Sequence, residues 1–416
     1  MKNCVFPIKA ASCLFFFAGQ LILSGMEDSA EVRHALAFEE QIASLPYKTL
    51  EPVGTPQAVQ LPSGWHRGFN HYHTAFHYPA PCTVSPAELA SRLREIGASF
   101  AFCAGDHTSK HGTGWWDWRK YYPLCHEGGA SDVVLMPAME KHLCFQNIVP
   151  PESSRYRKKW ENMTKAGGKA QHHTVVPSMD IPSSMGEENP EKVFEGVKKQ
   201  GSSLVINHPF CHMAAGHPDP LLIPLLYRFD YFEFFTGVGF LQDLRMYLEF
   251  LSDPRSCRMG CCAGQDNDDG SIHPKEMSSQ FTHLYAGPRF SRESLMEAWN
   301  MRRSYASHGH LYFEKLSPVP SILDVKTRDL PVIEFEVKNS AGKAVSKVEI
   351  YRNGKRVYEG AGEGHPSLRF RWQDPRPESE NHYIIHIEAG PDHLVTSPMN
   401  VLFISSAKFV GLNRLW

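Results

Sequence analysis

Histidine is the residue type that first points to chemistry in this chain. The 416 residues include 22 histidines, and 13 of these lie between His66 and His217. Imidazoles and carboxylates gathered in one place suit zinc, manganese or iron rather than calcium. The clustering therefore indicates metal binding or acid–base chemistry.

The metal-capable side chains follow apolar, strand-like runs. There are five such places: His71 and His73 after 65–70, Asp106 and His107 after 100–105, Glu140 after 133–139, His208 after 204–207, and Asp266 after 259–265. In a parallel α/β barrel the C-terminal ends of all strands open on one face, so we expect these groups to converge there. One such histidine alone would more simply be a core residue, but five coincident strand ends favour a metal site.

Alternating strands and helices between Trp65 and Ser317 supply the frame for this site. Ser85 as N-cap, Pro86 at the first helical position and Glu88 as capping-box partner predict a helix that ends at Gly97. Further strands are expected at 133–138, 204–207, 231–235, 259–264 and 281–286, and helices at 190–200, 241–252 and 291–303. Apolar strands separated by helices predict a parallel sheet or barrel.

After Pro318 the pattern changes to short alternating segments. They lie at 332–337, 345–352, 356–360, 368–372, 382–389 and 401–405. Asn353-Gly354, between two of them, is a strong signal for a two-residue hairpin, because both turn positions must tolerate positive φ. Strands with turns and no helices predict an Ig-like β-sandwich over residues 318–416.

The N-terminus has the pattern of a signal peptide. Lys2 and Lys9 precede or flank an apolar stretch at 10–23, which is short and interrupted for a membrane span. We expect cleavage near residue 25, export to the periplasm or the extracellular space, and a helix with a linker over residues 26–63. The alternative is a buried N-terminal helix. Among ten cysteines, one or two disulfides are possible after export.

Composition excludes several classes of protein. A net charge of −2 removes the basic field that a general nucleic-acid binder needs. No stretch after residue 30 approaches the ~20 apolar residues of a membrane span. No nucleophile elbow, Walker-type phosphate-binding loop or dinucleotide fingerprint appears, so serine hydrolase, nucleoside-triphosphatase and dehydrogenase functions lack support.

The order of the strand-end motifs resembles the polymerase-and-histidinol-phosphatase (PHP) family. The motifs are His71-Tyr-His73-Thr, Asp106-His107-Thr108, Pro137-Ala-Met-Glu140, Asn207-His208-Pro209 and Gly264-Gln-Asp266. The segment 85–109 is similar to that family's helix and strand between its first two motifs. The resemblance covers about residues 64–317, and the added β-domain is similar to the branch named for carbaryl hydrolase and a microcin-processing protein.

This resemblance implies a distorted (β/α)7 barrel that holds two or three divalent ions (Zn, Mn or Fe). It implies three groups of ligands: His71, His73, Glu140 and Asp266 in one site; Glu140, as a bridge, with His208 and His173 in a second; and His107 with His77 in a third. His172 and His142 are the alternatives to His173.

Two features depart from the family's pattern. The family usually has histidine two residues after the last aspartate, whereas this chain has Asp268 there, and we include Asp268 among the expected ligands. An insertion of about thirty residues also follows Glu140, which separates it from His173.

The resemblance also assigns roles around the metals. A metal pair lowers the pKa of a shared water and polarises the scissile oxygen. Asp106, with His107 a catalytic candidate, is expected to orient that imidazole, and protonation of the leaving group is the alternative. Trp115, Trp116 and Lys141 are the expected substrate-binding residues, although the tryptophans could instead anchor their own loop.

We therefore expect an exported metal-dependent hydrolase, a phosphoesterase acting on a small molecule, anionic substrates included. One alternative uses the same metals on a carboxylic ester, amide or carbamate, since metal-activated water does not select phosphorus. The other is a non-catalytic ligand-binding protein built on the same fold, for which the Asp268 departure is the best support.

Overall fold

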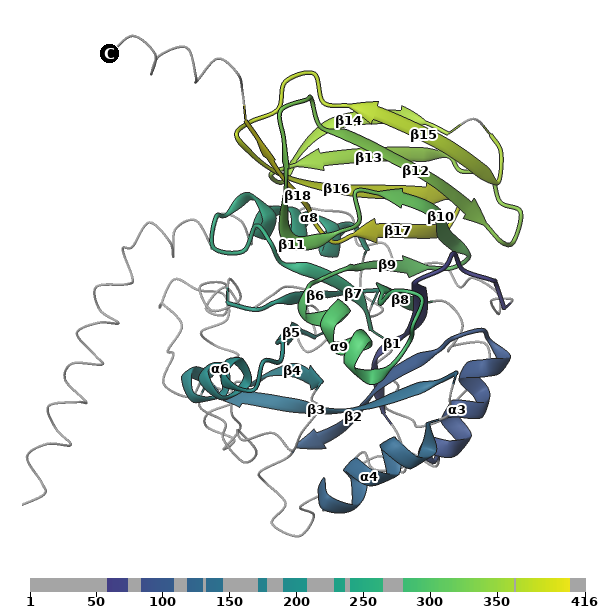
Figure 1. Ribbon diagram of the computed structural model, residues 1–416, viewed down its shortest axis with the longest axis vertical. Helices are drawn as coiled ribbons and strands as arrows, with labels where there is room; N and C mark the ends of the chain where they lie inside the picture. Colours follow the sequence, from purple (N-terminus) through teal and green to yellow (C-terminus); the bar gives the residue numbers. More distant parts are fainter. Residues whose placement is uncertain are drawn as a thin grey trace, which may run out of the picture.

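The computed structural model describes residues 58–73, 84–107, 118–129, 132–144, 171–177, 190–207, 228–235, 240–264, 280–362 and 364–404. The expected signal peptide, and most of the helix and linker before residue 63, lie outside these residues. The described part is a mixed α/β structure rich in strands, with a strand-only region stacked on an α/β region (Figure 1).

The α/β region contains the five described helices and nine strands. The helices are α3 (Pro86–Glu95), α4 (Trp118–Gly128), α6 (Pro190–Lys199), α8 (Phe240–Ser252) and α9 (Arg292–Asn300). The strands are β1 (Trp65–His73), β2 (Phe100–His107), β3 (Val134–Cys144), β4 (Gln171–Pro177), β5 (Val205–Ile206), β6 (Tyr231–Phe234), β7 (Gly260–Ala263), β8 (Gln280–Tyr285) and β9 (Ser304–His308).

These strands form two arcs of hydrogen-bonded sheet. One arc has the order β9-β8-β1-β2-β3-β4, and the other has the order β5-β6-β7. Within them β1-β2-β3 and β5-β6-β7 run parallel, while β3/β4, β1/β8 and β8/β9 run antiparallel. The arcs approach each other twice, because β4 lies beside β5 and β7 lies beside β8 and β9.

The expected distorted (β/α)7 barrel is not confirmed. Among the described residues the strands do not close into one hydrogen-bonded ring, and three pairings are antiparallel. The physical reason is that short apolar runs such as 281–286 are buried in either orientation, so their composition carries no strand direction.

The predicted helix start at Ser85 is confirmed. The Ser85 hydroxyl accepts a hydrogen bond from the Glu88 amide at 3.2 Å, and Pro86 opens the helix. The Glu88 carboxylate pairs with Arg92 on the next turn. Gly97 ends the helix with φ of 68°, a left-handed conformation that favours glycine.

Two apolar layers pack on opposite faces of β1–β3. The outer layer joins these strands to α3 and α4 and includes Phe69, Tyr72 and Leu93. The inner layer fills the space between the two arcs: Phe100, Phe102, Ala104, Met136, Ala138, Val205, Tyr231, Cys262, Leu295 and Trp299. Trp299 of α9 stacks on Tyr231 with ring centroids 3.7 Å apart, so α9 supports this interior from one end.

The C-terminal region is a two-sheet β structure. Its strands are β10 (Leu311–Ser317), β11 (Ser321–Thr327), β12 (Val332–Asn339), β13 (Lys347–Arg352), β14 (Lys355–Ala361), β15 (Ser367–Gln373), β16 (Glu380–Ala389), β17 (Asp392–Thr396) and β18 (Met399–Phe403). One sheet is β10-β12-β15. The other contains β11, β18, β16, β17, β13 and β14, and β17 continues onto β9 of the α/β region.

The side chains between these sheets form one apolar core, which includes Phe313, Phe335, Ile350, Ile385 and Ile387. The hairpin predicted at Asn353-Gly354 is confirmed, since Arg352 pairs with Lys355 and both turn residues have positive φ, 51° and 75°.

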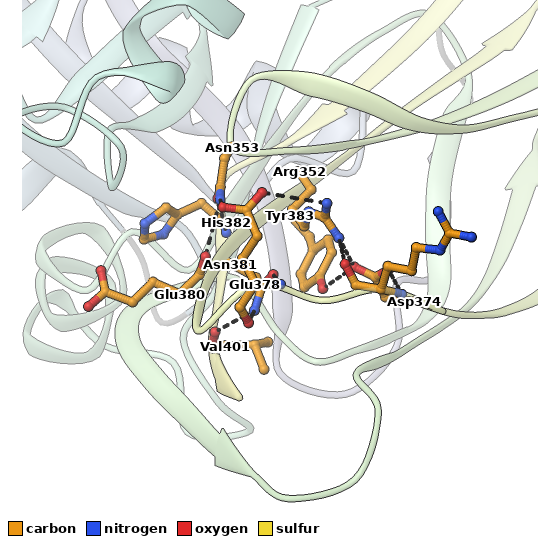
Figure 2. A network of polar contacts seen from close by, with 10 residues as sticks. Arg352, Asn353, Asp374, Glu378, Glu380, Asn381, His382, Tyr383 and Val401 are labelled. Carbon is orange, nitrogen blue, oxygen red and sulfur yellow. Dashed lines mark hydrogen bonds and ion pairs between the residues drawn. The ribbon is translucent and has the colours of Figure 1, made fainter. Parts of the chain in front are cut away.

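A polar network closes one end of this region (Figure 2). Asp374 is 2% exposed and accepts hydrogen bonds from Arg352 Nη1 at 2.7 Å and from the Tyr383 hydroxyl at 2.6 Å. Asn353 accepts from the His382 amide at 2.8 Å, which ties the hairpin to β16. Donors and acceptors in this network face each other, as expected of buried polar groups that support a fold.

Two further expectations are answered for the described residues. No described helix combines the length and the apolar character needed to cross a bilayer. The thiols of Cys125, Cys257, Cys261 and Cys262 are free, so none of these four forms a disulfide.

Candidate metal centre

A bulge in β1 turns two histidines into the molecule. Phe69 pairs with Ala101, but Tyr72 pairs with Cys103, so β1 has one residue more than β2 over this stretch. Phe69 and Tyr72 consequently both pack in the outer apolar layer, their rings stacked 5.7 Å apart. His71 and His73 belong to neither apolar layer, and both are fully buried.

Glu140 continues the inward-facing side of β3. Met136 and Ala138 belong to the inner apolar layer, and side chains alternate along a strand, so Glu140 lies on the same face two residues later. It is 3% exposed and ends the apolar column with a carboxylate. Asn207 and Glu233 follow Val205 and Tyr231 of the inner layer in the same way, and both are fully buried. A polar layer therefore sits on the apolar interior.

Three side chains of that layer converge within bonding range of one point. His71 Nε2 and His73 Nε2 are 3.1 Å apart. Glu140 Oε1 lies 3.6 Å from His71 Nε2, and Glu140 Oε2 lies 3.4 Å from His73 Nε2. We call His71, His73 and Glu140 the barrel triad, after the barrel that the sequence analysis predicts for this region.

The other ring nitrogen of each histidine faces an oxygen. His73 Nδ1 lies 3.2 Å from the Ala104 carbonyl oxygen, and His71 Nδ1 lies 3.3 Å from Glu233 Oε1. Neutral imidazole that keeps its proton on Nδ1 presents a lone pair at Nε2. Two such lone pairs and a carboxylate then face one another, an arrangement that repels unless a cation lies between them.

The distances within the triad fit a metal ion. Zinc bonds to nitrogen and oxygen are about 2.0–2.2 Å, so ligand atoms at tetrahedral angles lie about 3.3–3.6 Å apart. The three measured separations, 3.1, 3.6 and 3.4 Å, are close to that range. Metal-bound histidines also usually hold their second ring nitrogen against a carboxylate or a backbone carbonyl. His73 does so through the Ala104 carbonyl, and His71 Nδ1 lies within ion-pair distance of the Glu233 carboxylate.

Glu233 is a site residue that the sequence analysis missed. Besides approaching His71, its Oε1 accepts a hydrogen bond from Asn70 Nδ2 at 3.2 Å. Gly264 makes room for it, because a Cβ at that position would lie 2.2 Å from the Glu233 carboxyl carbon. The available signal was a single acid in the apolar strand Tyr231–Phe234.

Burial changes the protonation of a neighbouring carboxyl group. Burial raises the pKa of Asp243 well above its usual range, and the charge of Glu233 raises it further, although a hydrogen bond from the Phe235 amide acts in the opposite direction. Burial therefore favours the neutral form of Asp243.

Four expected site residues have a described backbone only. Asp106 and His107 end β2, where they pair with Glu140 and Lys141 of β3. His173 of β4 pairs with His142 of β3, and Val175 pairs with Glu140. The backbone thus places Asp106, His107 and His173 on strands that pair with β3, the strand that carries Glu140. Six further expected residues lie outside the described part: His77, Trp115, Trp116, His208, Asp266 and Asp268.

A separate cavity of about 470 Å³ opens beside the residues that precede β6 and β7, away from the triad. Its basic lining consists of Lys198, Arg228, Arg255, Arg258 and Arg302. Four of these cations already have carboxylate partners: Arg228–Glu191, Arg255–Asp253, Arg258–Asp324 and Arg302–Asp230. The cavity is therefore a weak anion site and plays no part in the metal centre.

No protein-family model matches this sequence, and no curated protein is significantly similar to it. Among solved structures, a two-domain protein from Bacteroides vulgatus containing a predicted PHP-like metal-dependent phosphoesterase is 13% identical, with a TM-score of 0.41, over 84% of this chain and 98% of that one. A candidate metal-dependent phosphoesterase from Bifidobacterium adolescentis is 14% identical, with a TM-score of 0.33, over 53% of this chain and 91% of that one.

A lytic polysaccharide monooxygenase from Jonesia denitrificans is 14% identical, with a TM-score of 0.17, over 21% of this chain and 62% of that one. All three scores are too low to establish a shared fold. Function is therefore inferred from the site itself.

Proposed function

We propose that this chain is a metal-dependent hydrolase of the PHP type that cleaves phosphoric esters. One observation carries the proposal: two imidazole Nε2 atoms and the Glu140 carboxylate meet within 3.1–3.6 Å, while the Nδ1 atom of each imidazole faces an oxygen acceptor. Two imidazole nitrogens and a carboxylate are suitable ligands for a divalent cation, and their mutual approach is unfavourable without one.

His71, His73 and Glu140 would hold the metal. On the resemblance, Asp266 would complete this site, His208 and His173 would add a second ion with Glu140 as the bridge, and His107 with His77 or Asp268 would serve a third. Bound ions of this kind supply Lewis-acid activation of water and of the scissile oxygen.

The protein's own contribution is orientation. Glu233 fixes the His71 ring, and the Ala104 carbonyl fixes the His73 ring, so both Nε2 atoms face the same point before any ligand arrives. The apolar layer beneath, with Phe102 and Met136, excludes water from that side and strengthens electrostatic interactions at the site.

The proposed organisation follows from the same resemblance. Residues 64–317 form a distorted PHP-type barrel. The support is that each of the two arcs contains three parallel strands and that the arcs approach each other twice. Residues 318–416 form an appended β-sandwich. Trp115, Trp116 and Lys141 would contact a small anionic substrate, Asp106 would orient His107, and the N-terminal pattern would direct export.

Metal content and turnover of paired histidine variants test the function. The full chain is stripped with a chelator, reloaded with Zn²⁺ or Mn²⁺, and assayed on p-nitrophenyl phosphate, bis(p-nitrophenyl) phosphate and p-nitrophenyl acetate. We expect metal-dependent release from a phosphate ester, lost in His73→Ala. His66→Ala is the matched control, because His66 is on the same strand and stacks on Phe290 at 3.9 Å, near the Gly287 carbonyl.

Each other outcome has a meaning. Metal-dependent release from the acetate alone would replace the phosphoesterase with a carboxyl-ester hydrolase of the carbaryl-hydrolase type. Metal binding without turnover would favour a binding protein. An equal metal content in His73→Ala and His66→Ala would overturn the metal centre itself.

A further inference from the structure

A second histidine cluster lies in the sandwich, on the sheet face turned toward the α/β region. Ile385 and Ile387 of β16 pack in the sandwich core, so the alternating neighbours His386 and Glu388 point to the opposite face. Glu388 pairs directly with His393 of β17. These three side chains therefore share one face of one hairpin.

We propose that His386, Glu388 and His393 form a metal site for Zn²⁺ or a similar divalent transition ion. Their ligand atoms all lie within 4.8 Å of one another. His386 Nε2 is 3.3 Å from His393 Nδ1 and 3.7 Å from Glu388 Oε1. Ligands at tetrahedral angles around zinc are separated by about 3.3–3.6 Å, so both distances approach that geometry.

A buried carboxylate orients the first ligand. Glu349 of β13 pairs with His386 across the sheet, and its Oε2 lies 2.8 Å from His386 Nδ1. With Nδ1 donating to that oxygen, Nε2 keeps its lone pair for a cation. A carboxylate that holds the far nitrogen of a histidine is the usual support of a bound transition metal.

The charge around the cluster also suits a cation. Glu349 lies in contact with three partners: His386 Nδ1 at 2.8 Å, Lys347 Nζ at 2.9 Å and Arg356 Nη1 at 2.8 Å. Lys347 and Arg356 thus share three carboxylates, those of Glu349, Glu359 and Glu388, which leaves one more negative than positive charge around the cluster.

The site is closed on one side and open on the other. The Phe240 ring of α8 stacks on His393 at 4.2 Å and lies 5.1 Å from His386. Glu388 keeps 26% of its side chain exposed, which leaves a route for an ion and for water to complete the coordination. A metal here would bind at the contact between the two regions of the molecule.

Zinc stoichiometry of the full chain tests this proposal. The protein is stripped with a chelator, dialysed against Zn²⁺ and analysed for metal per chain. We expect His393→Ala to bind one zinc fewer than the wild type. Glu388→Gln should bind that zinc more weakly by at least the roughly 10–100-fold that loss of a supporting carboxylate costs. His365→Ala, an exposed histidine of the same region, is the control and should match the wild type.

The barrel triad is intact in all of these variants, so the difference does not depend on the proposed function. Conversely, His73→Ala should retain the zinc of the sandwich. Far-ultraviolet circular dichroism checks the fold, and Glu388→Gln, with its partly exposed side chain, keeps the test valid if His393→Ala unfolds. Equal zinc content and affinity in wild type, Glu388→Gln and folded His393→Ala would overturn the site and leave a simple hydrogen bond between two histidines.

Discussion

Two buried polar clusters in this molecule differ in the balance of donors and acceptors. In the sandwich network of Figure 2, Asp374 receives hydrogen bonds from an arginine and a tyrosine, so each charge or hydroxyl meets its complement. In the barrel triad, two imidazole nitrogens and a carboxylate face one another across 3.1–3.6 Å. In the first cluster the charge of Asp374 is balanced by Arg352 within the protein, whereas the second cluster gains from a cation.

The difference separates a structural role from a functional one. Buried polar groups that support a fold form their hydrogen bonds within the protein. When one partner is removed, the other remains buried without a hydrogen bond, and the fold loses stability. Acceptor groups that converge on one point destabilise the protein when no ligand is bound. Such an arrangement is typical of ligand sites. The His386 cluster lies between these cases, because His393 is placed either to donate to His386 or to share a metal with it.

Neutralising Glu140 should have the largest effect on function and little effect on stability. Glu140→Gln keeps the side-chain shape but removes the negative charge, so we expect metal-dependent turnover to fall to the uncatalysed background. The amide can donate to an imidazole lone pair, so the metal-free protein should be as stable as wild type or more stable by up to about 1 kcal/mol. Urea unfolding of the stripped proteins and metal analysis check both parts. Loss of several kcal/mol in the stripped variant would contradict the imbalance of acceptors.

Neutralising Asp374 should do the reverse. Arg352 and the Tyr383 hydroxyl both donate to Asp374 Oδ2, and the Arg376 amide donates to Oδ1. In Asp374→Asn the side-chain NH2 group must therefore face a donor at one of these two positions, and the Arg352 guanidinium loses its negative partner. We expect a loss of about 3 kcal/mol in the free energy of unfolding, at the low end for breaking a buried ion pair because Arg352 retains 15% exposure. Metal content and turnover per folded molecule should not change. A variant with unaltered stability but reduced turnover would remove the distinction between the two clusters.

A smaller effect is expected at Glu233, which acts on the metal through His71. Glu233→Gln can still accept from Asn70 but carries no charge to hold the His71 ring. We expect metal affinity about 10–100-fold lower, with the same number of ions at saturation. Competition with a chromogenic chelator measures the affinity. Gln242→Asn, also buried but on α8, is a control for nonspecific damage to this layer.

The sequence predicted the local elements well because their signals are local. Ser85 and Gly97 bound α3, and Asn353-Gly354 makes the sandwich hairpin, since capping and positive φ depend on adjacent residues. The convergence of His71, His73 and Glu140 also followed from a simple regularity, the position of each at the end of an apolar run. The sequence also predicted that His107 and His173 join the site, and for these two residues only the backbone position is described.

The missed features depend on contacts between distant segments. The bulge between Phe69 and Tyr72 appears only when β1 is paired with β2, and the antiparallel direction of β8 only when it is paired with β1. Glu233 was overlooked because the strand around it is buried on both faces, which hides alternation. The His386 cluster was hidden in the same way, within a strand whose burial is almost continuous.

Acid should weaken the fold gradually through a histidine that belongs to neither metal site. His283 of β8 is buried against Tyr305, with ring centroids 4.2 Å apart, and its Nε2 lies 3.0 Å from the Ser307 hydroxyl. Burial lowers the pKa of His283 well below 6.5, and the charge of Arg67 lowers it further. The native ring therefore stays neutral while the unfolded chain takes up a proton as the pH falls through about 6.5.

Because the unfolded state binds more protons there, the free energy of unfolding must fall as the pH is lowered, by at most about 1.4 kcal/mol per pH unit for this group. The loss begins near the unfolded pKa and continues down to the depressed native pKa. Urea unfolding gives the free energy of unfolding at about pH 7 and at about pH 5.5. We expect His283→Gln to reduce the difference between these two values by up to about 1.4 kcal/mol. Chelator-stripped protein is used throughout, so that metal release contributes nothing. If wild type and His283→Gln lose stability in parallel, the acid sensitivity must come from other groups.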